Sequence, residues 1–325
     1  MAPSLSSQPP PCQHFTLSFP AQHVLLVTIN RPKAMNSIPT SGHEDGMALW
    51  KWYDNEPSLR VAVVTGAGQK AFCAGADLIE QGSLRASSAG PKKPMPYGGF
   101  MGLSRRVGKK PVIAAVNGFA LGGGFEIALN WSVPLFSPQS TPRDHTIVVF
   151  SALLPFSPPF PAINVKATIR ANPSSHKFNS DIVLSSPTAV YGLPEAKRGL
   201  YAAAGGLARV VRTFNMQTAT EIALSGRTLS ATEAAALGFG RVAKTPDSLL
   251  DEALALAKLV TELSPDAVIV SRAGLREAWE TGSVERAAQL TDERFGAALF
   301  EGENIKIGLA AFAKKGKPEW MPSKL

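Results

Sequence analysis

Two turns made of small residues are the parts of this sequence best suited to bind a polar group through the backbone. The first is FCAGAD (residues 72–77), and the second is LGGG (residues 121–124). Small side chains allow a ligand to approach the main chain closely, although the first turn taken alone is more typical of an ordinary loop. The glycines of the second turn open a helix, so unpaired N–H groups and the positive end of the helix dipole can face an anion or an oxyanion.

Two glutamates could supply acid–base chemistry near these turns. Glu126 lies in the first turn of the glycine-led helix among apolar neighbours. This setting favours a carboxyl group with a shifted pKa, although a carboxylate there could also simply complement the helix dipole. Glu195 follows a proline in the segment 185–200 and, by itself, is typical of a surface acid paired with a base. The AAAGG run (202–206) then predicts another helix start and accessible backbone near the same place.

In their order along the chain, these segments resemble the crotonases, the enoyl-CoA hydratase and isomerase superfamily. The resemblance also covers INRPKAMNSI (29–38), SGRTLSATEAAALGFGRV (225–242) and AFAKKGKPEW (311–320). It implies an α/β fold, a crotonase-type spiral of ββα repeats, with C-terminal helices that pack trimers into a hexamer. It also implies an acyl-CoA thioester as the substrate, with no separate cofactor and no metal.

The resemblance assigns roles residue by residue. It implies that the main-chain amides of Ala76 and Gly123 form an oxyanion hole for the thioester carbonyl, where one such donor is worth roughly 3 to 4 kcal/mol. Glu126 and Glu195 match the two carboxylates of hydratases, of which one holds and deprotonates water and the other supplies a proton. The sequence does not say which does which. The residues expected to contact the acyl-CoA are Ala34, Ala74, Ala76, Asp77, Leu78, Ile79 and Gly123.

The elements that must position these residues follow from hydrophobic periodicity. Apolar β-branched runs predict strands at 24–29, 61–65, 112–116 and 182–184. Helical periodicity predicts helices at 41–53, 100–107 and 124–129, and then at 248–263, 264–280, 283–300 and 303–315. Strands separated by helices imply an α/β core with parallel pairing, followed here by a layer of helices. We therefore divide the chain into a disordered arm (1–20), a spiral core (21–245), an all-helical oligomerisation region (246–320) and a tail (321–325).

The segment 131–180 interrupts this pattern. It holds eight of the 26 prolines, no glycine and one acid, and its apolar residues follow neither strand nor helix periodicity. A structureless loop of this length is uncommon inside a compact core. Either it is a retained intron, or it is an unstructured insertion with a regulatory or partner-binding role. Codons allowed at Trp131 and Ser180 supply GT and AG splice boundaries. Splicing there keeps the reading frame and joins Asn130 to Asp181 through a cysteine, which restores the family's Ala-x-x-Cys-Asp turn.

Composition limits the classes of protein. A net charge of +8 and a pI near 9.5 favour a polyanionic partner such as CoA or a nucleic acid. No basic block is interleaved with aromatic residues, which counts against nucleic acid. We expect neither a membrane span nor a secretory signal, because no long uncharged apolar run is present. Two cysteines and five scattered histidines show no metal-ligand spacing.

The last three residues, Ser323-Lys324-Leu325, match a peroxisomal targeting signal that an import receptor reads. We therefore predict a peroxisomal enoyl-CoA hydratase that adds water reversibly to a 2-enoyl-CoA, as in β-oxidation. One alternative is a hydratase, dehydratase or isomerase for a specialised acyl-CoA of fungal secondary metabolism, such as siderophore or toxin assembly. Another is a non-catalytic RNA-binding or scaffold homologue.

Overall fold

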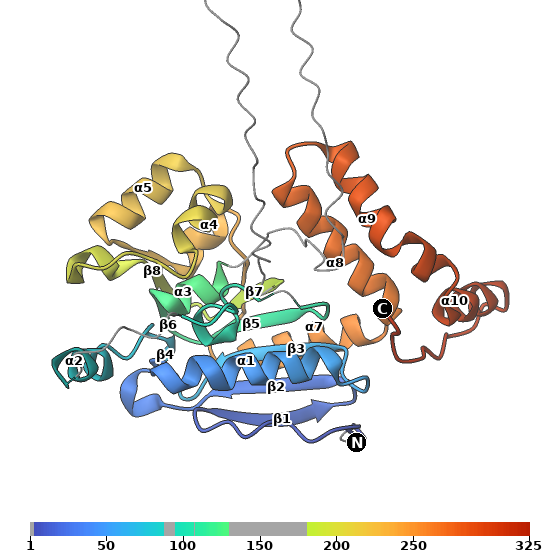
Figure 1. Cartoon of the computed structure of the whole chain (residues 1–325), viewed down its shortest axis with the longest axis horizontal. Coiled ribbons are helices and arrows are strands. Elements are labelled where there is room, and N and C mark those ends of the chain that lie inside the picture. Colours follow the sequence, from blue (N-terminus) through green and yellow to red (C-terminus); the bar gives the residue numbers. More distant parts are fainter. Residues whose placement is uncertain (1–2, 88–94, 107, 130–180) are drawn as a thin grey trace, which may run out of the picture.

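The computed structural model describes residues 3–87, 95–106, 108–129 and 181–325. The insertion predicted at 131–180 therefore lies outside the described residues. Two β-sheets form the centre of the described part, and helices cover them and extend to one side (Figure 1).

The larger sheet has six strands in the order β1-β2-β3-β5-β7-β10. The strands are β1 (Phe15–Ala21), β2 (Val24–Ile29), β3 (Val61–Gly66), β5 (Val112–Val116), β7 (Ile182–Ser185) and β10 (Arg241–Val242). Neighbouring strands are parallel except for the antiparallel pair β1 and β2. The four predicted strands and their parallel pairing are therefore confirmed.

The smaller sheet has the order β4-β6-β8-β9. Its strands are β4 (Ala71–Cys73), β6 (Phe119–Leu121), β8 (Val190–Gly192) and β9 (Thr228–Ser230). The chain alternates between the sheets, since β3, β5 and β7 of the larger sheet lead to β4, β6 and β8 of the smaller one. Helices α2 (Leu78–Ser87) and α3 (Gly123–Ala128) follow β4 and β6, which confirms the spiral of ββα repeats. Three-residue strands are too short to show a period, so the sequence did not predict them.

The remaining core helices are short except for α1 (Thr40–Asn55). The short ones are η1 (Pro32–Ala34), η2 (Phe100–Gly102), η3 (Pro194–Arg198), α4 (Gly206–Thr213), α5 (Met216–Ser225) and α6 (Ala231–Ala236). The prediction of a helix over 100–107 is wrong for its described residues 100–106, where only the 3-10 turn η2 forms. Met101 and Gly102 adopt φ of 55° and 62°, which an α-helix cannot continue through.

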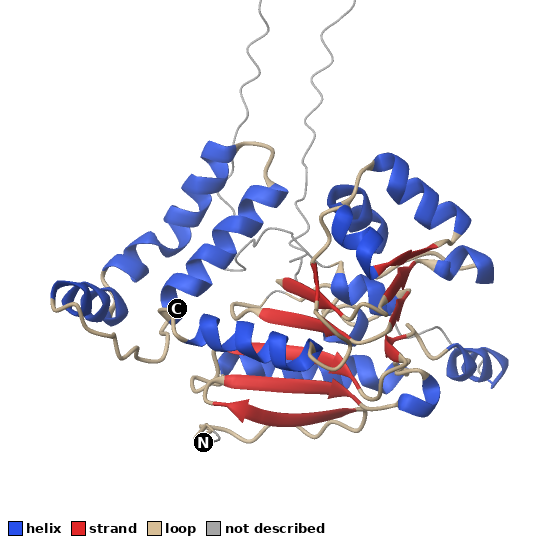
Figure 2. Cartoon of the chain, turned by 180° about the vertical axis from the view of Figure 1, so that it is seen from behind, coloured by secondary structure: helices blue, strands red, loops and turns tan. Residues whose placement is uncertain are grey.

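Helices cover the larger sheet (Figure 2), and its strands β2, β3 and β5 are buried on both faces, which explains their continuous apolar runs. On one face, Val63 and Ile113 pack in a cluster with Ala253 of helix α7 (Leu249–Thr261). On the other face, Val64 packs in the main core, which includes Trp50 of α1. Each fully buried side chain of this size contributes about 1.5 to 3 kcal/mol.

The C-terminal region is helical as predicted. After α7 come α8 (Pro265–Glu280), α9 (Val284–Phe300) and α10 (Glu303–Ala313), which project to one side of the core (Figure 1). Ser264 and Ser283 cap α8 and α9 by accepting hydrogen bonds from the N–H groups of the first turn. No helix in the described ranges has the length and apolar character needed to cross a lipid bilayer.

The N-terminal residues from 3 onward do not form a disordered arm, so that prediction is wrong for them. Phe15 begins strand β1, which pairs along β2. Leu5 and Cys12 pack against the main core. The Glu56 carboxylate accepts hydrogen bonds from the Ser6 N–H at 3.0 Å and from the following amide, which anchors the segment before β1. These contacts are tertiary, so the proline-rich composition of the segment could not reveal them.

Candidate active site

The structure brings the two small-residue turns together. Strand β4 leads into residues 74–77, its neighbour β6 leads into α3, and the two strands are paired. A Cβ placed on Gly75 would lie 2.9 Å from the Leu121 carbonyl oxygen and 3.4 Å from the Gly123 nitrogen. Gly75 also has φ of 94°, which favours glycine. Ala76 and Gly123 therefore lie on adjoining turns.

The Ala76 and Gly123 amides are available to a ligand. Within the described ranges, neither N–H has a backbone acceptor, whereas the adjacent Asp77 and Gly122 amides do. Gly123 is the first residue of α3, where no acceptor exists inside the helix. The Phe100 ring closes the other side, because a Cβ on Gly123 would lie 2.5 Å from it. Two adjacent donors of this kind suit an oxygen that gains negative charge.

Glu126 points into the interior beside the AAAGG run. It is 4% exposed, and its Oε1 accepts a hydrogen bond from the Gly206 N–H at 2.8 Å. The pKa of Glu126 is raised to about 7, mainly by burial and to a smaller extent by the negative charge of Glu195. The Gly206 hydrogen bond and the positive charge of Arg209 oppose this rise in pKa. The predicted shift in the pKa of this carboxyl group is therefore present, and desolvation is its main cause.

Glu195 reaches the same turn from η3. A Cβ on Gly122 would lie 3.0 Å from Glu195 Oε1, so this carboxylate packs against the glycine that precedes Gly123. Gly122 has φ of 53° and ψ of −123°, a backbone conformation that suits only glycine. Glu195 Oε2 is buried without a hydrogen-bond partner among the described residues. Burial also raises the pKa of Glu195.

The two glutamates approach the same region from α3 and η3. The negative charge of Glu195 contributes to the raised pKa of Glu126, and burial raises the pKa of both carboxyl groups. A raised pKa lets a carboxyl group keep its proton closer to neutral pH. Such a pair can remove one proton and deliver another, which is the chemistry that an elimination or an addition of water requires.

Two of the predicted CoA-contacting residues, Ala34 and Ala74, lie on segments that are hydrogen-bonded together. The Ala74 N–H donates to the carbonyl of Met35, the residue after Ala34, at 3.0 Å. The fully buried Asn36 adds a second tie, since its Nδ2 donates to the Ala71 carbonyl oxygen at 2.7 Å. The structure thus places Ala34 and Ala74 on neighbouring turns.

The other predicted CoA contacts mark the start of α2. Asp77 pairs with Arg31 at 2.9 Å and accepts a hydrogen bond from the Glu80 N–H at 3.2 Å, so this residue also supports the loop and the helix. Leu78 and Ile79 are 40% and 85% exposed, which leaves an apolar surface next to the Ala76 turn.

Sequence reasoning missed the residues that support the glutamates. Arg209 is 7% exposed in the first turn of α4, and its guanidinium donates to the Gly205 carbonyl oxygen at 2.9 Å. A cation in the first turn of a helix is unfavourable beside the positive end of the helix dipole, unless a negative charge lies nearby. The position of Arg209 in the sequence could therefore have indicated a nearby acid. Phe100 was also missed, because the segment around it was predicted as a helix.

A model of the family described as enoyl-CoA hydratase/isomerase matches residues 20–133 and 177–323 of the chain. The chain belongs to this family. The match stops and resumes close to the ends of the predicted insertion. An enoyl-CoA hydratase structure from Mycobacterium tuberculosis H37Rv superposes with a TM-score of 0.71 at 27% identity, covering 95% of this chain and 99% of that one.

Two relatives are more similar in sequence. The mevalonyl-coenzyme A hydratase SIDH of Beauveria bassiana is 40% identical over 99% of this chain and 100% of the relative. The mevalonyl-coenzyme A hydratase sidH of Aspergillus fumigatus is 38% identical over 97% of this chain and 98% of the relative. Both similarities therefore extend over nearly the whole chain.

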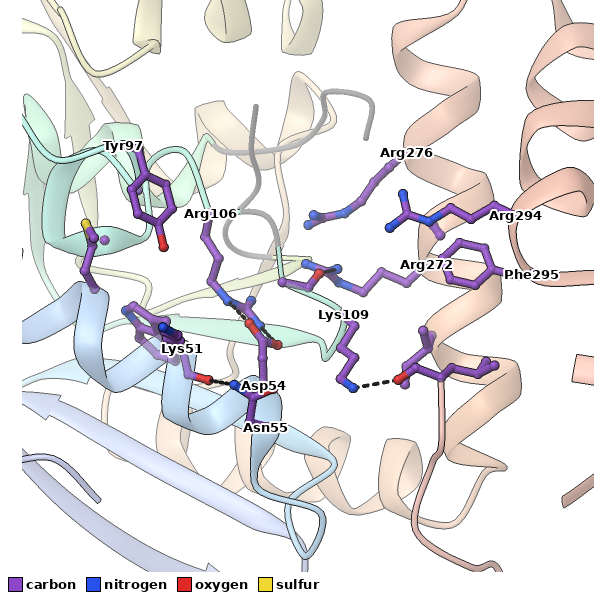
Figure 3. A pocket seen from close by; sticks show the side chains of 18 of the residues that line it. Lys51, Asp54, Asn55, Tyr97, Arg106, Lys109, Arg272, Arg276, Arg294 and Phe295 are labelled. Atoms are coloured by element: carbon purple, nitrogen blue, oxygen red, sulfur yellow. Dashed lines mark hydrogen bonds and ion pairs between the residues drawn. The ribbon is translucent and has the colours of Figure 1, made fainter. Parts of the chain in front are cut away.

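A separate basic cavity of about 480 Å³ lies between α1 and α8–α9 (Figure 3). Arg106, Arg272, Arg276 and Arg294 line it together with Asp54, and neither Glu126 nor Glu195 does. Arg106 pairs with Asp54, and Lys109 Nζ donates to the Leu325 oxygen at 2.6 Å. The C-terminal tail is therefore anchored at this cavity, apart from the glutamate pair.

Proposed function

We propose that this chain catalyses reversible dehydration of a branched, hydroxylated acyl-CoA of the mevalonyl-CoA type. The observation that carries the proposal is 40% and 38% identity, over nearly the full length of both chains, to two proteins named mevalonyl-coenzyme A hydratase. Identity to the enoyl-CoA hydratase of known structure is lower, at 27%. This difference favours the predicted alternative, a specialised acyl-CoA of fungal secondary metabolism such as siderophore assembly, over a general β-oxidation hydratase.

The site geometry supports a specific sequence of bond changes. In the dehydration direction, one carboxylate takes a proton from C2 while the other glutamate, protonated, delivers its proton to the leaving C3 hydroxyl. The C3–O bond breaks, water leaves, and the C2=C3 double bond forms. Negative charge that develops on the thioester oxygen faces the Ala76 and Gly123 amides. Hydration reverses each step, with the same two residues exchanging protonation states.

The ionisation of the pair suits this scheme. The pKa of Glu126 is about 7, so this carboxyl group exchanges its proton near neutral pH. The buried and unpartnered Oε2 of Glu195 can accept a hydrogen bond from water or from the substrate hydroxyl. If one carboxyl group is protonated and the other ionised at neutral pH, the site has both an acid and a base, which two freely exposed carboxylates would not supply.

The test compares mevalonyl-CoA dehydration with crotonyl-CoA hydration by following the absorbance of the enoyl thioester. We expect kcat/KM for the mevalonyl pair to exceed that for crotonyl-CoA by about 10-fold or more, since mismatched pocket contacts cost about 1 to 3 kcal/mol. Glu126→Gln and Glu195→Gln should each lower kcat by about 10²- to 10⁴-fold. Glu293→Gln, whose side chain is 60% exposed on α9, is the matched control.

Two outcomes would contradict this proposal. A preference for crotonyl-CoA would restore the general hydratase as the better interpretation. Activity that survives both glutamate substitutions would remove the pair from the mechanism, whichever substrate is preferred.

We also propose peroxisomal import through Ser323-Lys324-Leu325. The tail is partly buried, since the Leu325 N–H donates to Ser323 Oγ at 3.1 Å and Lys109 holds the Leu325 oxygen. A receptor that reads the tripeptide must therefore break the Lys109 contact. A fluorescent protein fused before residue 1 should co-localise with a peroxisomal marker and become diffuse when Leu325 is deleted. A diffuse signal from the full-length fusion would contradict import.

We further propose that α8–α10 mediate assembly into a trimer or hexamer. These helices carry large exposed apolar side chains, among them Leu275 (75% exposed), Val284 (79%), Phe300 (66%) and Phe312 (85%). Apolar surface of this extent is typical of an interface. Sedimentation should show trimers or hexamers, and Phe312→Glu together with Leu275→Glu should shift the population toward monomer. A monomeric wild-type chain would contradict the proposal.

A further inference from the structure

One buried hydroxyl connects two segments that support opposite sides of the proposed site. Ser104 is fully buried just after η2. Its Oγ accepts a hydrogen bond from the Phe100 N–H at 2.9 Å and donates to the Ala204 carbonyl oxygen at 3.0 Å. A serine hydroxyl has one proton and two lone pairs, so it can make both bonds at once.

The Phe100 end of this connection leads to the oxyanion turn. A Cβ on Gly123 would lie 2.5 Å from Phe100 Cδ2 and Cε2 and 2.6 Å from Cζ, so the ring is in close contact with this glycine. The ring also packs on His43 with a centroid distance of 4.7 Å, which limits its movement on the far side. The position of the Phe100 backbone therefore limits how closely Gly123, and with it the start of α3, can lie to the Phe100 ring.

The Ala204 end leads to the first glutamate. Ala204 stands two residues before Gly206, whose N–H donates to Glu126 Oε1 at 2.8 Å. Arg105 supports the same turn, since its guanidinium donates to the carbonyl oxygens of Ala203 and Ala204. The Gly206 N–H therefore points from a turn whose carbonyl oxygens accept hydrogen bonds from Ser104 and Arg105. The direction of this N–H depends on those hydrogen bonds.

We propose that Ser104 is a positioning residue that sets the distance between the oxyanion turn and the Glu126 carboxylate. It contacts neither Glu126 nor the Gly123 amide, and it acts through Phe100 and the turn at Ala204. The proposal rests on the proposed function, because these two supports matter to catalysis only in a hydratase site. The Phe100–Ser104 hydrogen bond also lies within residues 100–106, which fold as tight turns although the sequence predicts a helix over 100–107.

Ser104→Ala should leave the Phe100 N–H without its acceptor and remove one of the two side-chain contacts of the Ala204 carbonyl oxygen, the other being that of Arg105. A displacement of about 1 Å lowers rates by about 10²-fold, so we expect kcat to fall by about 10-fold to 10²-fold. KM should change less than about 2-fold, because the Ser104 hydroxyl bonds Phe100 and Ala204 and not the loops of Ala34 and Ala74, which are predicted to hold CoA. The limb of the pH profile that reports Glu126 should move to higher pH, because weakening the Gly206 hydrogen bond removes an interaction that lowers the pKa of Glu126.

The experiment first measures hydrogen exchange by mass spectrometry without substrate. Ser104→Ala should speed exchange in peptides covering both 119–129 and 200–210, and Ser104→Cys, which keeps a weak donor, should be intermediate. The matched control is Ser186→Ala. Ser186 is also fully buried, but its hydroxyl bonds Thr188 at 2.8 Å within its own turn. The control should leave exchange in both peptides unchanged. Steady-state kinetics of the same three variants follow.

Exchange that is unchanged in either peptide would overturn the proposal. A loss of kcat that Ser186→Ala reproduces would do the same, because it would reflect general destabilisation. If Ser104→Ala does not fold, Ser104→Cys carries both measurements. A wild-type chain that dehydrates none of the tested thioesters would contradict the proposed function and leave the exchange test intact.

Discussion

Replacing Glu126 by Gln should remove activity and, above neutral pH, stabilise the protein. The carboxyl group is 4% exposed, and its pKa rises from 4.5 to about 7. At about 1.4 kcal/mol per pKa unit, ionising it disfavours the folded state by about 3 kcal/mol relative to the unfolded state. Glutamine never ionises, and its amide oxygen can still accept the Gly206 N–H.

The pH at which this difference develops follows from the two pKa values. Below pH 4.5 the carboxyl group is protonated in both states and contributes no difference. Between pH 4.5 and about 7 it ionises in the unfolded state first, so the free energy of unfolding of the wild type falls as pH rises. Above about pH 7 the full penalty is present. Glu126→Gln should therefore match the wild type near pH 4.5 and exceed its stability by up to about 3 kcal/mol near pH 8.

Urea unfolding measured at several pH values checks this prediction without any substrate. Wild type, Glu126→Gln and the exposed control Glu293→Gln are compared between about pH 5 and about pH 8. A stability difference for Glu126→Gln that does not change with pH, or that has the opposite sign, would refute the assignment of a buried ionisable carboxyl group to this site. The control should show no pH-dependent difference of this size.

Three further predictions follow from packing, ionic contacts and the interrupted segment. Gly123→Ala should place a methyl group against Phe100 and lower the free energy of unfolding by about 1 to 3 kcal/mol, measured by urea unfolding, whereas Gly82→Ala, with open space around it, should not. Asp181→Asn should cost about 3 to 5 kcal/mol in the same assay, because the carboxylate, whose side chain is only 14% exposed, pairs with two arginines of α8, and a loss below about 1 kcal/mol would contradict this. A chain in which one cysteine replaces 131–180 should show higher soluble yield and kcat than the full 325-residue chain, and equal values would contradict a retained intron.

Local sequence patterns were sufficient to predict the framework around the site. The strand at 24–29 and the helix at 265–280 carry their own signals, since an uninterrupted apolar run and a Ser-Pro cap are read from neighbours in sequence. The glycine turns are equally local, because close backbone approach requires small residues wherever it occurs. These features depend on residues only a few positions apart.

The sequence by itself determined which groups can do the chemistry, namely two bare turns and two glutamates, because residue type fixes what a side chain or an amide can donate or accept. Only the tertiary structure decided that Glu195 packs against Gly122, that Gly206 holds Glu126, and that Ser104 connects two segments about a hundred residues apart. Burial, pKa and hydrogen-bond partners are properties of space that long-range packing creates. The spacing of apolar residues along the sequence, with a period of two or of 3.6, therefore does not predict them.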